Sequence, residues 1–112
     1  MDLPLRRIIV FAKKPEKLAA FYAAAFGLTE VAREEGFVDL ASGDMQLAFH
    51  LASQTPTASH KLCFFTDDVV AIREHLTSFG AKMNRIQTAA KGLEFCDGRD
   101  PEGNRFQISN RA

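Results

Sequence analysis

The stretch GRDPEGNRFQIS, residues 98–109, decides the fold of the chain. Its DPEG core, residues 100–103, is turn chemistry, because aspartate caps the first turn position, proline pre-sets φ at the second and glycine closes the fourth. In residues 104–109 apolar side chains then alternate with polar ones. This pattern predicts a half-buried antiparallel strand whose polar face, including Gln107, points at whatever the sheet encloses.

The size and composition of the chain are those of one soluble globular domain. It has 112 residues, of which 46% are hydrophobic and 25% charged. The 14 basic and 14 acidic residues cancel, so no net field favours nucleic acid or an anionic membrane. No run reaches the roughly 20 apolar residues of a membrane span, and the first residues do not follow the order of a signal peptide. We therefore expect a cytoplasmic protein that binds neither nucleic acid nor membrane.

The first half of the chain predicts one helix among four strands. Pro15 opens the helix at its first turn, an apolar stripe repeats at helical spacing behind it, and Gly27 ends it. Gly36 and Gly43 mark two hairpin turns between the strands that follow. The expected strands are residues 5–12, 29–33, 37–41 and 45–52.

The second half repeats this order after a polar, linker-like stretch at residues 53–59. Asp67 and Asp68 supply a cap and negative charge for a second helix, which Gly80 ends. The buried stripe of this helix is predicted to be Val69, Ile72, Leu76 and Phe79. The expected strands are residues 61–66, 82–88, 93–99 and 104–109.

An internal repeat relates the two halves. An offset of 54 residues takes Arg7 to Lys61, and in the last strands an offset of 59 takes Ala48 to Gln107. One four-stranded sheet with one helix leaves a sheet face uncovered, so two copies of a βαβββ unit are the economical interpretation. The alternative is a chance likeness of two α/β halves.

Three segments carry a family resemblance: residues 15–28 (PEKLAAFYAAAFGL), residues 65–69 (FTDDV) and residues 100–108 (DPEGNRFQI). In this order and spacing, which spans nearly the whole chain, they resemble the vicinal oxygen chelate superfamily of glyoxalases, bleomycin resistance proteins and extradiol dioxygenases. The resemblance implies an α+β fold in which two βαβββ modules form curved mixed sheets around a cleft. It also implies a homodimer. We expect a single domain, residues 1–112, with module one at 1–52 and module two at 60–112.

The resemblance also locates a metal site. Metal-using members take one His, Glu or Gln from the first and last strand of each module, and those positions here hold Arg7, Ala48, Lys61 and Gln107. Arginine has no usable lone pair, lysine is protonated near neutral pH and alanine offers no ligand atom, so only Gln107 can coordinate. We therefore expect no metal and no cofactor.

The histidines and cysteines offer few alternatives. His50 shares a strand face with Ala48 and is a candidate cleft residue, whereas His60 and His75 are expected to be ordinary surface residues. Cys63 and Cys96 lack metal-type spacing and are expected to be buried, reduced thiols.

Arg7 and Lys61 replace the metal ligands at equivalent positions of the two modules. Two cations facing one cleft repel each other unless negative charge lies between them. We therefore expect a carboxylate, enolate or phosphate of a small molecule to be bound there. The expected ligand-binding residues are Arg7, Lys61, Gln107, His50, Phe11 and Phe65. The alternative is pairing within the protein, with Asp39, Glu94 or Asp97, or cations that face water.

Three functions remain open. The favoured one is a metal-free protein that sequesters a small organic molecule, anionic or antibiotic-like. The second is an enzyme, either a metal-dependent lyase, isomerase or dioxygenase with an unrecognised ligand set, or a metal-independent one that uses Lys61 or His50 as general base. The third is a protein-interaction module with a vestigial cleft and an exposed sheet edge.

Overall fold

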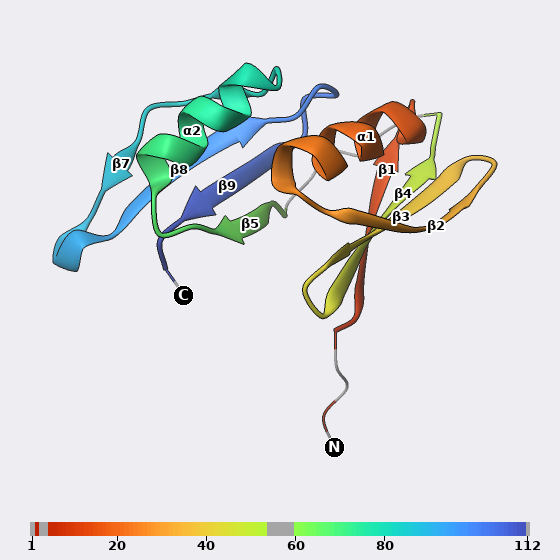
Figure 1. The fold of residues 1–112 in the computed structure, drawn as a ribbon, viewed down its shortest axis with the longest axis horizontal. Helices are drawn as coiled ribbons and strands as arrows, with labels where there is room; N and C mark the ends of the chain where they lie inside the picture. The colour runs from red at the N-terminus through yellow and green to blue at the C-terminus, as the bar shows by residue number, and fades with distance from the viewer. Residues whose placement is uncertain (1, 3–4, 54–59, 112) are drawn as a thin grey trace. The chain divides into compact units, whose positions relative to one another are not determined.

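The computed structural model describes residues 2, 5–53 and 60–111. The chain divides into two compact units, Met1–Pro56 and Thr57–Ala112, which we call module one and module two and describe separately (Figure 1). The expected linker, residues 53–59, lies outside the described residues except for Ser53. Among the described residues, no helix is long and apolar enough to cross a membrane.

Module one is a four-stranded sheet with one helix. Its elements are β1 (Arg7–Ala12), α1 (Pro15–Phe26), β2 (Thr29–Glu34), β3 (Phe37–Ser42) and β4 (Met45–Leu51). The strand order is β1-β4-β3-β2, in which β1 and β4 run parallel and the other pairs antiparallel. Helix α1 begins at Pro15 and ends at Gly27, whose φ of 67° is the left-handed conformation that glycine adopts without strain.

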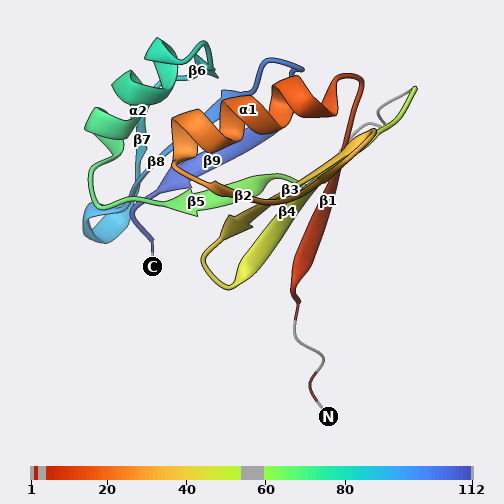
Figure 2. The same ribbon diagram turned by 45° about the vertical axis from the view of Figure 1, so that its right-hand side comes forward.

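The core of module one lies between α1 and one face of its sheet (Figure 2). Leu18 and Tyr22 of the helix are each 1% exposed, and Val38 and Phe49 of the sheet are fully buried. The Tyr22 and Phe49 rings lie 5.3 Å apart. Because side chains alternate along a strand, the neighbours of these core residues point to the opposite face of the sheet.

Module two repeats this arrangement. Its elements are β5 (Leu62–Phe65), α2 (Val69–Ser78), β6 (Lys82–Met83), β7 (Gln87–Thr88), the 3₁₀ turn η1 (Ala90–Gly92), β8 (Glu94–Arg99) and β9 (Arg105–Ser109). The order is β5-β9-β8-β6, with β7 also paired to β8 and with β5 and β9 parallel. As expected, Asp68 caps α2, because its Oδ1 accepts the Ala71 N–H at 3.0 Å.

The turn that feeds β9 forms around one buried carboxylate. Asp100, 4% exposed, accepts the backbone N–H groups of Glu102 and Asn104 on Oδ1, each at 2.9 Å. The Gly103 N–H closes the turn on the Asp100 carbonyl, and the φ of Gly103 is 86°. The turn predicted from the DPEG sequence is confirmed, and it sets the register in which Asp97 faces Gln107.

Two expectations about module two are wrong. Residues 82–88 form two short strands, because the carbonyl of Asn84 accepts Arg73 Nε at 2.8 Å and the Cys96 thiol at 3.0 Å instead of a ladder N–H. Phe79, placed on the buried stripe of α2, follows the helix and is 43% exposed. Neither change alters the class, so the predicted α+β fold of two βαβββ modules is confirmed.

Candidate functional site

The sheet face of module one that α1 does not cover carries three of the six expected ligand-binding residues, Arg7, Phe11 and His50. Register places Ile9 beside Ala48, and Phe11 beside His50. On the other side of β4, Asp39 lies beside Ala48, and Phe37 lies beside His50. We call this surface the open face of module one; its members are Arg7, Ile9, Phe11, Phe37, Asp39, Gln46, Ala48 and His50.

An ion pair joins β1 to β3 across this face. Arg7 Nη2 donates to Asp39 Oδ2 and also to Gln46 Oε1, the latter at 3.3 Å. The Asp39 side chain is only 3% exposed, whereas that of Arg7 is 44% exposed. Within the described part of the chain, Asp39 Oδ1 is buried and has no hydrogen-bond partner. The carboxylate is therefore satisfied on one oxygen only.

His50 lies between two phenylalanines on the same face. Its ring meets Phe37 edge to face, with centroids 5.1 Å apart. His50 Nε2 is the other buried side-chain atom without a hydrogen-bond partner among the described residues. Phe11, on the other side of His50, is 45% exposed, so an aromatic surface adjoins an unsatisfied ring nitrogen.

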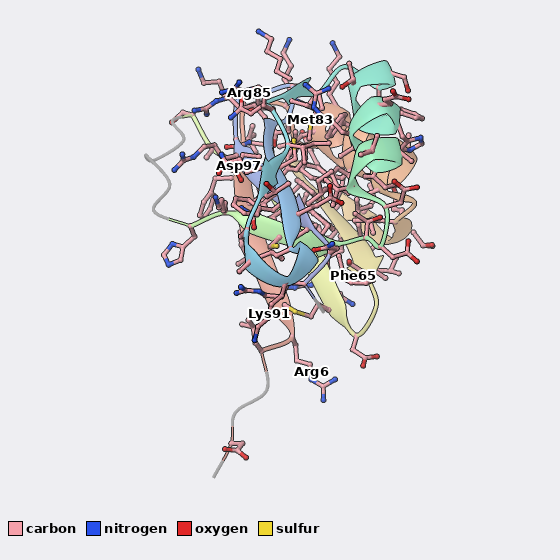
Figure 3. All side chains as sticks on the ribbon, turned by 90° about the vertical axis from the view of Figure 1, so that its left-hand side faces the viewer. Arg6, Phe65, Met83, Arg85, Lys91 and Asp97 are labelled. Carbon is pink, nitrogen blue, oxygen red and sulfur yellow. The ribbon has the colours of Figure 1, made fainter. Side chains whose placement is uncertain are left out.

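On the corresponding face of module two, both oxygens of Asp97, which is labelled in Figure 3, accept hydrogen bonds. Lys61 Nζ donates to both Asp97 oxygens at 3.1 Å, and Gln107 Nε2 donates to Oδ1 at 2.9 Å. Cys63 Sγ donates to Gln107 Oε1 at 3.6 Å. Partial burial raises the pKa of Asp97, but the hydrogen bonds from Gln107 and Lys61 and the Lys61 charge outweigh it and hold that pKa below its ordinary value.

The two modules thus place a cation and an aspartate at equivalent positions, with one difference. Asp39 lies opposite Ala48, and Asp97 lies opposite Gln107. In module two the amide of Gln107 completes the carboxylate, while alanine has no donor to do so in module one.

The pairing alternative for the two cations is the one that the structure contains. Arg7 pairs with Asp39 and Lys61 with Asp97, each within its own module. Glu94 pairs with neither of them; its backbone N–H donates to Asn110 Oδ1. The sequence named both aspartates only as an alternative to ligand binding by the two cations. The separation of Asp39 and Asp97 along the chain nearly equals the offset of 59 residues that relates the last strands of the two modules.

The other residues that the sequence singled out lie in module two. Phe65, at the end of β5, is 60% exposed (Figure 3). His75 is on α2, where its ring lies 4.9 Å from that of Phe79, and His60 precedes β5. The expectation that both cysteines are buried is wrong for Cys63, which is exposed, and correct for Cys96.

Two further features bear on what the site can hold. Within residues 2, 5–53 and 60–111, no group of three or more His, Cys, Asp and Glu side chains gathers as metal ligands would. A hollow of about 490 Å³ is lined by Asn84, Arg85, Ile86 and Gln87 of module two. None of the six expected ligand-binding residues lines this hollow.

Solved structures share this fold along nearly the whole chain. A glyoxalase/bleomycin resistance protein/dioxygenase family enzyme from Burkholderia phytofirmans PsJN matches with a TM-score of 0.87 and 22% identity, covering 96% of this chain and 98% of that one. TioX from Micromonospora sp. ML1 matches with a TM-score of 0.80 and 17% identity, covering 97% and 99%. A lactoylglutathione lyase from Agrobacterium tumefaciens matches with a TM-score of 0.76 and 19% identity, covering 97% and 94%.

The curated proteins include no significant match to this sequence. The family model described as a glyoxalase-like domain, by contrast, matches residues 7–109, from the start of β1 to the end of β9. The matched segment contains both modules, the Arg7–Asp39 pair and the Asp97 network. The chain therefore belongs to the glyoxalase-like domain family of the vicinal oxygen chelate superfamily.

Proposed function

We propose that this protein binds a small organic molecule on its open sheet faces and that it does so without a divalent cation. The observation that carries the proposal is the occupation of the four positions at which the superfamily resemblance implies metal ligands. They hold Arg7, Ala48, Lys61 and Gln107. Both cations among them donate to carboxylates of their own module.

The donor set at these positions does not fit a metal ion. Divalent cations in proteins take several carboxylate, imidazole, thiolate or carbonyl ligands. Arg7 and Lys61 bring positive charge instead, and Ala48 brings no ligand atom. Gln107 alone has a carbonyl oxygen, and that oxygen lies 3.6 Å from the Cys63 thiol as its acceptor. One amide oxygen is too few for a stable site.

The open face of module one supports binding of a flat apolar molecule. Ile9 and Phe11 are 46% and 45% exposed, and the edge-to-face pair of Phe37 and His50 adjoins them. Apolar and aromatic side chains with a few placed polar atoms are the usual lining of small-molecule sites. Binding of an anionic ligand makes a further demand on the protein. Arg7 and Lys61 then have to leave the protein carboxylates with which they pair and bind a carboxylate of the ligand instead.

A thermal-shift screen of aromatic acids, antibiotics and phosphorylated metabolites tests the proposal. A ligand at one hundred times its Kd adds about 2.7 kcal/mol to the free energy of unfolding. Arg7→Ala and Lys61→Ala are expected to abolish any shift that depends on an anionic group. Arg33→Ala is the matched control, because Arg33 also pairs with an acid, Glu30, on the exposed strand β2.

Two results would contradict the proposal. The first is near-stoichiometric zinc, nickel, manganese or iron in protein purified without chelator, which would favour the metal-enzyme alternative. The second is a complete absence of small-molecule shifts combined with a specific co-purifying chain, which would favour the interaction module. Sedimentation of the pure protein tests the predicted homodimer separately.

A further inference from the structure

The two aspartates at equivalent positions differ in how fully their hydrogen bonds are made. Asp97 accepts from Lys61 on both oxygens and from Gln107 on Oδ1. Asp39 accepts from Arg7 on Oδ2, while its Oδ1 is buried without a partner among the described residues. Asp39 is also the more deeply buried, at 2% exposure. Buried polar atoms in folded proteins are nearly always hydrogen-bonded, so this oxygen calls for a donor.

Register explains why the donor is absent from module one. The residue opposite Asp97 is Gln107, whose amide lies 2.9 Å from the carboxylate. The residue opposite Asp39 is Ala48, which has no polar side-chain atom. Gln46, the next residue on this face of β4, presents its Oε1 to Arg7 instead. Module one therefore keeps the cation and the acid of the pattern and lacks its third member.

We infer that Asp39 Oδ1 recognises an N–H or O–H group on the bound molecule, in the place that the Gln107 amide takes in module two. This inference rests on the proposed function and narrows its ligand. The donor has to be uncharged, because Arg7 already balances the charge of Asp39 and would repel a second cation beside it.

The surroundings of Asp39 specify the rest of the ligand. His50 is diagonal to Asp39 on the same face, at the roughly 7–8 Å spacing of such cross-strand neighbours. Its buried Nε2 offers a second unsatisfied polar atom. Ile9 and Phe11 present exposed apolar surface on β1 alongside. The ligand class is thus a flat, uncharged aromatic molecule with a hydrogen-bond donor at the edge of its ring.

Binding of such a molecule requires the Arg7 side chain to move. Its guanidinium is 44% exposed and is held by Asp39 Oδ2 and by a longer contact of 3.3 Å to Gln46. A change of side-chain rotamer on an otherwise unchanged sheet is a common response to binding. The contact that is released is the longer one to Gln46, so that Oδ2 keeps its bond to Arg7 while the ligand donor reaches Oδ1.

The test compares indole with 1-methylindole, in which a methyl group replaces the hydrogen of the ring N–H. Each probe is titrated into the full chain and followed by amide chemical shifts of module one. Indole is expected to bind roughly tenfold more tightly than 1-methylindole, the ratio that one hydrogen bond to a charged acceptor gives. Asp39→Asn, which replaces one carboxylate oxygen by a donor, is expected to remove this preference. Asp44→Asn, on the exposed turn before β4, is the control and keeps it.

A second variant keeps the test decisive if Asp39→Asn does not fold. Ala48→Ser places a hydroxyl directly opposite Asp39, so the protein supplies the missing donor itself. It is expected to raise the melting temperature and to reduce the indole preference. Equal binding of both probes, or no saturable shift with either, overturns the inference. Hits elsewhere in the thermal-shift screen would in that case leave the proposed function standing, whereas an empty screen together with a specific co-purifying chain would remove both.

Discussion

Removing Arg7 is expected to destabilise module one more than removing the charge of Asp39. The two partners of this ion pair differ in exposure, at 44% for the Arg7 side chain and 3% for that of Asp39. Arg7→Met leaves a buried carboxylate with neither oxygen paired, because Oδ1 already lacks a partner among the described residues. Asp39→Asn leaves a guanidinium that water can solvate. The buried partner therefore determines the cost.

The magnitudes follow from the same exposures. Breaking a fully buried pair costs about 3–5 kcal/mol, and an exposed pair contributes about 0.2–1 kcal/mol. A pair with one exposed partner falls between these limits, so we expect about 2 kcal/mol for Arg7→Met and about 1 kcal/mol for Asp39→Asn. In module two the carboxylate is the more accessible of the two, at 23% for the Asp97 side chain against 3% for that of Asp39. Lys61→Met is expected to cost about 0.5 kcal/mol.

Urea unfolding followed by circular dichroism measures these differences, with equal m-values required for the comparison. Arg33→Met removes an arginine whose pair with Glu30 is exposed on both sides, and no measurable change in its urea midpoint is expected. The reasoning is refuted if Asp39→Asn destabilises the protein as much as Arg7→Met, or if Lys61→Met costs more than either. Those results would mean that burial of the carboxylate does not set the energetics of this face.

Three further predictions concern module two. Gly98→Ala is expected to cost about 1–2 kcal/mol in urea unfolding, because the alanine Cβ would lie 2.9 Å from both Met83 Cε and Phe106 Cζ. Adding Met83→Ala should restore part of this loss. Full stability of Gly98→Ala alone would contradict the close packing at this glycine. The pKa of Asp97 is lowered by its hydrogen bonds, so the contribution of this carboxylate to stability is present above about pH 4 and is lost as pH falls through its folded-state pKa. Between about pH 5 and about pH 2, Asp97→Asn should therefore lose less stability than the native chain. Parallel plots of unfolding free energy against pH for the two proteins would count against the network. Asp68→Ala removes the cap of α2 and is expected to cost about 1 kcal/mol in thermal unfolding, whereas an unchanged melting temperature would show that the cap contributes nothing.

Local chemistry made much of the fold predictable. Helix α1 begins at Pro15 and ends at Gly27, as the sequence predicts, since both residues act through their own backbone geometry. The DPEG turn formed for the same reason, with Asp100 accepting the N–H groups of residues two and four positions later. Features that depend on one residue and its immediate neighbours can be inferred without knowledge of the rest of the chain.

Features that depend on distant partners could not be predicted in this way. The strand expected at residues 82–88 is interrupted because Arg73, on a helix, reaches the carbonyl of Asn84. Asp39 is the partner of Arg7 because of the register of β3 on β4. Alternation of side chains along a strand predicts on which face of the sheet a residue lies, but not which residue of the neighbouring strand lies opposite it. The unsatisfied oxygen of Asp39 is a property of that register as well. The sequence therefore named candidate residues but did not predict which carboxylate pairs with each cation.

The strand order has a consequence for synthesis of the protein on the ribosome. In both modules the first strand has a single neighbour in the sheet, and that neighbour is the last strand of the module, β4 for β1 and β9 for β5. A nascent chain that has passed residue 51 can already close its first sheet, whereas β5 waits without a partner until residues 105–109 emerge. During translation the first sheet can therefore be complete while β5 still exposes unpaired backbone groups. In that interval a chaperone could bind the exposed strand.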